Sequence, residues 1–169
     1  MNEQTARVRA AMEEYFGDDR RRIDHALRVT GYAGEILLHE PGDRELVLAT
    51  AYLHDIGIPE AERKHGSCAG PLQEIEGPPV ARGILARLGY EEPFIAEACA
   101  IIASHHSPGE VETDNFRIIW DADWLVNLGD EYDVTDGEKV AGLIGRIFMT
   151  ETGKRIAGET YLKGQIRHF

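Results

Sequence analysis

Cysteine and long apolar runs are scarce in this chain of 169 residues. The two cysteines, Cys68 and Cys99, form no closely spaced pair and are typical of free thiols in a reducing compartment, although a disulfide between them stays open. No apolar run approaches the length of a membrane-spanning helix. Residues 1–16 mix charged and apolar side chains without the apolar centre of a secretory signal, so they are predicted to form a first helix. We therefore expect a cytoplasmic protein that does not enter membranes.

Positive charge is also in deficit. The sequence has 18 Lys and Arg residues against 30 Asp and Glu residues, which gives a formal net charge of -12. Such a field repels long nucleic acids and anionic membranes. A small phosphorylated substrate is compatible with it only where metal ions or local Arg and Lys residues reverse the field.

Helical spacing of apolar residues dominates the sequence, and no segment alternates as a strand would. The length favours one domain, so we predict an all-α, compact single-domain helical bundle over residues 1–169. Predicted helices lie at 3–16, 20–39, 43–55, 79–88, 92–106, 114–129, 137–149 and 152–166.

The segment 59–77 is predicted to be the longest irregular stretch, and it can cover a site as a loop. Pro78 and Pro79 are expected in the first turn of the next helix, where a missing amide proton costs little. The chain contains no internal repeat and no low-complexity tract.

Metal-capable side chains lie on or beside apolar helix faces in four segments. His25 shares a helical face with Val29 and Ile36, and so it is predicted to point inward. His54 and Asp55 directly follow the almost wholly apolar residues 46–53, which places two potential ligands where a buried helix ends.

Asp121 is the most informative of these residues, because it shares an apolar stripe with Ile118 and Leu125. A carboxylate on such a face is costly unless it is paired or binds a metal. Asp123 lies off this stripe and is interpreted as a surface residue or a neighbour of the ligands. A single inward histidine is more often a hydrogen-bonded core residue, but several histidines and aspartates that converge in one small domain favour a cation.

The order of these residues resembles that of the HD superfamily of metal-dependent phosphohydrolases. The similar segments are IDHALRV, AYLHDIG and IIWDADWL, and the resemblance covers about residues 20–130. The helices at 137–166 would complete the domain. The resemblance implies a helical bundle with one divalent metal held by His25, His54, Asp55 and Asp121.

Two further segments imply a second metal. IIASHHSP places His105 and His106 where some members of the family carry paired histidines. EIEGPPVARGIL resembles a segment that usually begins with a histidine ligand, and here that position is Glu76, or Gln73 in an alternative alignment. Glutamate can bind a hard divalent ion, whereas Gln73 would weaken the second site. In the alternative interpretation His105 contacts the substrate phosphate and His106 lies in solvent.

The resemblance implies hydrolysis of a phosphate ester, of a nucleotide or another small phosphorylated metabolite. The cofactor would be one or two divalent ions, with Mn, Fe, Co, Ni, Zn and Mg all open. Asp55, which can bridge two ions, is expected to be catalytic together with His105 and Lys64. Candidate substrate-binding residues are Arg28, Lys64 and His65. Two other functions stay open: a dinuclear iron oxygenase on the same scaffold, and a non-catalytic module that binds metal and nucleotide.

Overall fold

The computed structural model describes residues 2–163, and this part of the chain forms helices without any β-strand. The all-α prediction is therefore confirmed. Residues 164–166 of the predicted last helix lie outside the described part. The helices are α1 (Glu3–Phe16), α2 (Arg20–Ile36), α3 (Arg44–Leu53), α4 (Ile58–His65), α5 (Gly70–Arg87), α6 (Glu92–Ile102), α7 (Asp114–Glu131), α8 (Gly137–Ile147) and α9 (Glu151–Tyr161).

Short polar side chains start the helices that carry the site. Asp19 accepts a hydrogen bond from a first-turn amide of α2, Asp43 does so for α3, and Thr113 does so for α7. Each cap satisfies a backbone donor that has no partner inside the helix. These local signals explain why the predicted starts of the three helices agree closely with the observed ones.

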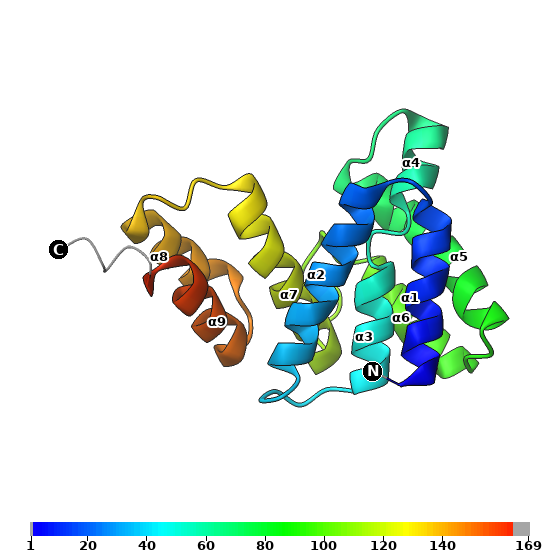
Figure 1. Cartoon of the computed structure of the whole chain (residues 1–169), viewed down its shortest axis with the longest axis horizontal. Helices are drawn as coiled ribbons and strands as arrows, with labels where there is room; N and C mark the ends of the chain where they lie inside the picture. Colours follow the sequence, from blue (N-terminus) through cyan, green and yellow to red (C-terminus); the bar gives the residue numbers. More distant parts are fainter. Residues whose placement is uncertain (1, 164–169) are drawn as a thin grey trace.

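Helix α3 lies at the centre of the bundle, between α1 and α2 in Figure 1. Every residue from Leu46 to Leu53 is buried. One side of α3, including Val47, packs into a core with α2 and α7, and the other side, including Leu53, packs into a second core with α1, α5 and α6. Because α3 is covered all round, the chain that leaves it buries His54 and leaves Asp55 only partly exposed.

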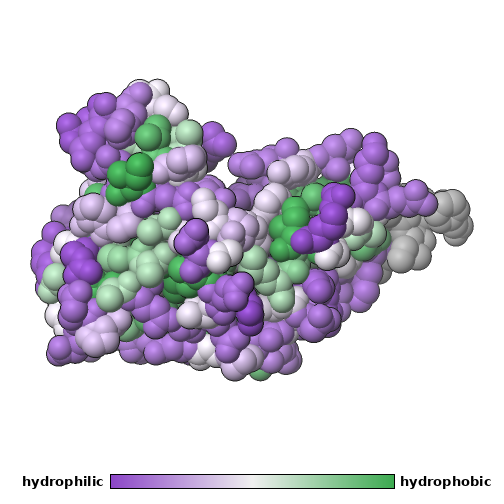
Figure 2. All heavy atoms as spheres, turned by 180° about the vertical axis from the view of Figure 1, so that it is seen from behind, coloured by the Kyte–Doolittle hydropathy of each residue, from purple (hydrophilic) through white to green (hydrophobic). Residues whose placement is uncertain are grey.

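Helices α8 and α9 lie beyond α7, on the side away from α3 (Figure 1). The face of the molecule in Figure 2 is mainly hydrophilic, with hydrophobic side chains in small groups. Among residues 2–163, no helix combines the length and the apolar character that crossing a membrane requires.

The prediction of a long irregular segment at 59–77 is wrong. Helix α4 occupies its first part and ends at Gly66, which has the left-handed φ of 66° that favours glycine. Helix α5 begins nine residues before the predicted start, so Pro78 and Pro79 lie in its interior. Two prolines remove two helical hydrogen bonds, but packing of α5 against α4 and α6 outweighs that local penalty.

A close backbone contact joins the turn between α3 and α4 to α5. A Cβ atom on Gly57 would lie 2.5 Å from the backbone nitrogen of Gly77, and 2.8 Å from the carbonyl oxygen of Gln73. Backbone atoms cannot move aside as a flexible side chain can. The pair Gly57 and Gly77 therefore allows α5 to pass directly beside the residues that follow Asp55.

We expect Gly57→Ala to lower the free energy of unfolding by about 1–3 kcal/mol, the usual cost of overpacking. Urea unfolding followed by circular dichroism measures this change. Gly31→Ala is the matched control, because a Cβ there meets no atom within 4 Å and the residue is exposed in the middle of α2. The control should be neutral or more stable by up to about 1 kcal/mol. Equal effects of the two substitutions would contradict the close-contact explanation.

Candidate metal centre

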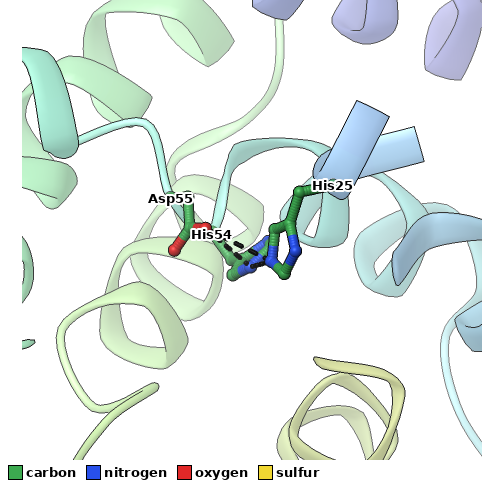
Figure 3. Close-up of side chains that lie close together, drawn as sticks. All are labelled: His25, His54 and Asp55. Atoms are coloured by element: carbon green, nitrogen blue, oxygen red, sulfur yellow. Dashed lines mark hydrogen bonds and ion pairs between the residues drawn. The ribbon is translucent and has the colours of Figure 1, made fainter. Parts of the chain in front are cut away.

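Four side chains from three parts of the fold meet at one point, and we call them the first cluster: His25, His54, Asp55 and Asp123. Helix α2 supplies His25, the end of α3 supplies His54 and Asp55, and α7 supplies Asp123. Figure 3 shows the two imidazole rings turned toward each other, with Asp55 beside them. His54 is buried and the other three are largely covered.

The distances inside the first cluster match those of ligands around one ion. His25 Nε2 lies 3.3 Å from His54 Nε2, 3.3 Å from Asp55 Oδ2 and 3.1 Å from Asp123 Oδ1. His54 Nε2 lies 3.4 Å from each of the same two carboxylate oxygens. Ligand atoms that are each about 2.1 Å from a common metal are separated by roughly 3.0–3.5 Å. The spacing therefore fits a divalent ion.

The histidine tautomers also suit metal binding. His54 Nδ1 lies 2.7 Å from the carbonyl oxygen of Ala51, and His105 Nδ1 lies 2.7 Å from that of Ile102. A carbonyl oxygen only accepts hydrogen bonds, so each Nδ1 carries a proton and donates it. In the neutral ring, the Nε2 lone pair then faces the cluster. Backbone partners of this kind commonly orient histidine ligands.

Electrostatics favour a positive charge at the first cluster. Burial alone would lower the pKa of His54, but the carboxylates of Asp55 and Asp123 outweigh it and raise this pKa to about 10. Burial likewise opposes ionisation of Asp55 and Asp123, but cationic His54 holds both pKa values below the usual range. The two carboxylates therefore stay ionised and hold either a proton on His54 or a metal ion in its place.

Asp121 is not part of this cluster, and its prediction as the fourth ligand is wrong. Its two carboxylate oxygens accept hydrogen bonds from the backbone N–H of Met149, the backbone N–H of Thr150 and the hydroxyl of Thr150, at 2.8, 2.8 and 2.6 Å. Thr150 in turn caps α9. The buried carboxylate thus fastens α9 to α7, and burial raises its pKa despite these hydrogen bonds.

Asp123 is the residue that the sequence interpretation missed. Helix α7 is buried on two faces: Asp121 lies on the one that meets α9, and Asp123 lies on the one that meets α2. In the sequence, the second face is visible as a stripe of residues at helical spacing. In the structure these residues all line one cavity: Trp120, Asp123, Trp124, Asn127 and Glu131. Asn127 Nδ2 donates a hydrogen bond of 3.0 Å to Asp123 Oδ1 and holds that carboxylate in place.

Asp55, His105 and His106 form a second cluster, whose potential ligand atoms lie within 4.8 Å of one another. Asp55 Oδ1 lies 3.3 Å from His105 Nε2, while Asp55 Oδ2 faces the first cluster. The Nε2 of His105 is buried, and apart from this contact with Asp55 it has no polar partner within residues 2–163. His106 is exposed on one side, and the covered part of its ring together with the neighbouring His105 lowers its pKa, so the ring is neutral near pH 7 and can bind a metal.

Glu76 does not belong to the second cluster, so this prediction is also corrected. Its carboxylate accepts hydrogen bonds from Lys64 Nζ at 2.7 Å and from His65 Nε2 at 3.1 Å. These two hydrogen bonds also lower the pKa of Glu76. Gln73, from the alternative alignment, lies beside the cluster instead, with its Oε1 3.0 Å from His106 Nε2.

The predicted substrate-binding residues are only partly brought together. The two clusters open into a cavity of about 570 Å³, which we call the main cavity because both clusters meet there. Arg28 lines this cavity, whereas Lys64 and His65 do not. Arg28 pairs with Asp130 at 2.8 Å. Arg21 also lines the main cavity, and within residues 2–163 it forms no ion pair, so its guanidinium is available to an anion.

The helical fold and the paired clusters define a metal-binding class of domain, and comparison with known proteins gives the family. Residues 22–128 match the family model of the HD domain, which is most of the chain, so the chain belongs to the HD-domain family. It is also similar to a crystal structure described as a predicted HD superfamily hydrolase from an uncultured Thermotogales bacterium. The identity is 27% and the TM-score 0.69, over 94% of this chain and 85% of that chain. No curated protein matches the sequence.

Substitutions of the two aspartates of α7 should affect thermal stability in different ways. A metal at 100 times its dissociation constant adds about 2.7 kcal/mol, or roughly 5–10 °C in Tm for a chain of this size. Asp123→Asn should lose most of this metal-dependent shift. Asp121→Asn should keep the shift but start from a lower Tm, because its amide cannot accept all three hydrogen bonds, at a cost of about 1–3 kcal/mol. Differential scanning calorimetry with and without EDTA measures both effects, and a full shift in Asp123→Asn would contradict the assignment.

Metal content distinguishes the residues of the second cluster. With excess metal, we expect the wild type to approach two ions per chain and His106→Ala to approach one. Glu76→Gln should stay at two, because Glu76 pairs with Lys64 and His65 rather than with Asp55 or His106. Elemental analysis after gel filtration gives the numbers. A loss of one ion in Glu76→Gln would restore Glu76 as a ligand.

Proposed function

We propose that the chain is a metal-dependent phosphohydrolase that acts on a small phosphate ester. The observation that carries the proposal is the position of Asp55, whose two carboxylate oxygens face two separate groups of histidines. A carboxylate in this position can bridge two ions. Residues of both clusters line the main cavity, whose volume of about 570 Å³ is within the usual range of about 300–1,000 Å³ for small-molecule sites.

Divalent ions bound at the two clusters would polarise a phosphoryl oxygen and lower the pKa of a water molecule that attacks phosphorus. The side chains supply the orientation that this chemistry needs. Ala51 and Ile102 hold the His54 and His105 rings through Nδ1, so that both Nε2 atoms point toward Asp55. Asn127 holds Asp123 in the same way. A phosphate oxygen therefore meets a rigid, prearranged set of groups.

Phosphate binding in an acidic protein requires local positive charge. Arg21, Arg22 and Arg28 all line the main cavity from α2. Arg22 pairs with Glu62 and Arg28 with Asp130, both at 2.8 Å. Arg21 is the best placed of the three to bind a phosphate oxygen, because no carboxylate in the described residues competes for it.

His105 is better suited to the second ion than to the substrate phosphate. Its Nδ1 proton is donated to the carbonyl of Ile102, so the neutral ring has no second proton for a phosphate oxygen. Lys64 also lies outside the cavity lining and pairs with Glu76. The catalytic role therefore falls on Asp55 as a ligand shared by the two clusters, with Arg21 in place of Lys64 at the phosphate.

The test is a screen of phosphate monoesters and diesters against the purified protein, loaded in turn with each divalent metal. Asp55→Asn should lower kcat/KM about 100-fold or more, because it weakens both clusters at once. Asp18→Asn is the matched control: this exposed aspartate precedes α2 and lines no cavity described above, so its activity should equal wild type. Oxygen uptake by the iron-loaded protein without phosphate release would favour an oxygenase. Binding without any turnover would favour the non-catalytic module.

A further inference from the structure

An aromatic wall, made of Trp120, Trp124 and Tyr132, lines the main cavity beside the first cluster. The ring centroids of Trp120 and Trp124 are 6.3 Å apart, and those of Trp124 and Tyr132 are 5.6 Å apart. The three rings are therefore continuous along the end of α7. None of them has a part in the hydrolytic chemistry described above.

Trp120 and Trp124 both pack part of their surface against the core formed by α2, α3 and α7, but their polar N–H groups differ. The indole N–H of Trp120 donates a hydrogen bond of 3.1 Å to the carbonyl of Ile147, so this side chain helps to hold α8 against α7. The indole N–H of Trp124 has no such partner within residues 2–163, and the ring is only partly buried. Tyr132 is 45% exposed. Large aromatic surface that stays open inside a concave polar cavity indicates a binding surface.

We propose that Trp124 stacks against a planar ring of the substrate, so that the phosphate ester hydrolysed here is a nucleotide-like molecule. This rests on the proposed function, because the phosphate is assigned to the neighbouring clusters. Trp124 directly follows Asp123 in α7, which places the stacking surface next to the phosphate position. The cavity of about 570 Å³ has room for a phosphate, a sugar and a ring.

Glu131 adds a preference for the edge of that ring. It lines the same cavity, and within residues 2–163 it has no ion pair, unlike its neighbour Asp130, which binds Arg28. An ionised carboxylate only accepts hydrogen bonds. It therefore complements a ring that carries an amino group, such as adenine, better than one that presents only acceptors.

Binding of adenosine tests the stacking surface without any turnover. The chain has two tryptophans, and both lie in the aromatic wall, so tryptophan fluorescence, excited selectively over tyrosine, reports on this surface alone. Adenosine should quench the fluorescence of the metal-loaded protein in a saturable manner, and calorimetry should give a Kd raised about 10-fold to 100-fold in Trp124→Leu. Trp124→Phe should recover most of the affinity, because it keeps a flat ring.

Tyr15→Leu is the matched control, since it removes an aromatic ring from a different cavity and should bind adenosine as wild type does. Purine riboside, which lacks the amino group, should bind more weakly than adenosine, and Glu131→Gln should reduce that difference. Equal adenosine affinity in Trp124→Leu and wild type would overturn the proposal.

Kinetics separate this proposal from the proposed function. With adenosine 5′-monophosphate, Trp124→Leu should raise KM and leave kcat nearly unchanged, while ribose 5-phosphate should be hydrolysed equally by both proteins. If both esters are hydrolysed and Trp124→Leu changes neither KM, the stacking surface is wrong and the phosphohydrolase stands. If no ester is hydrolysed with any metal but adenosine still binds through Trp124, the phosphohydrolase is wrong and the stacking surface stands.

Discussion

The carboxylate of Asp55 is the contact on which the rest of the site depends. One of its oxygens faces His25 and His54, and the other faces His105. This position exists because α3 is buried along its length and ends here, so that the chain leaving it meets solvent only through the cavity that Asp55 lines. The charge of the carboxylate must be compensated where it lies, by a proton on a histidine or by a metal ion. Folding of α3 into the core and the demand for a cation are therefore linked.

Helix α7 serves the fold and the site with two aspartates that lie two residues apart. Asp121 binds the start of α9, and Asp123 binds the histidines of α2 and α3. Both carboxylates are buried, but only that of Asp121 is stabilised by hydrogen bonds from backbone N–H groups and a hydroxyl. The other faces imidazoles, whose charge depends on pH and on metal. The same helix continues into the aromatic wall, so one element sets the metal position and the proposed ring position together.

The acidic surface limits the size of an anionic ligand but does not prevent a small phosphate ester from binding. A net charge of -12 disfavours long polyanions, yet three arginines of α2 line the main cavity. Two of them are already paired with carboxylates, so much of the positive charge for a phosphate must come from bound ions. A small phosphate ester that fits inside the cavity meets this local charge, whereas a long nucleic acid would also meet the surrounding negative field.

The sequence by itself determined the all-helical class, the starts of α2, α3 and α7, and the inward position of His25 and His54, because apolar spacing and capping residues are local. It did not determine which aspartate of α7 meets those histidines. The spacing of apolar residues indicates that a residue is buried but not which helix covers it. Because α7 is buried on two faces, the spacing alone could not assign each aspartate to its neighbour. Likewise, only the tertiary structure paired Glu76 with Lys64 and brought Gln73 to His106, since these contacts depend on α5 starting earlier than its prolines suggest. Packing across Gly57 and Gly77 outweighs the local signal of Pro78 and Pro79, and long-range contacts of that kind are not encoded in any short segment.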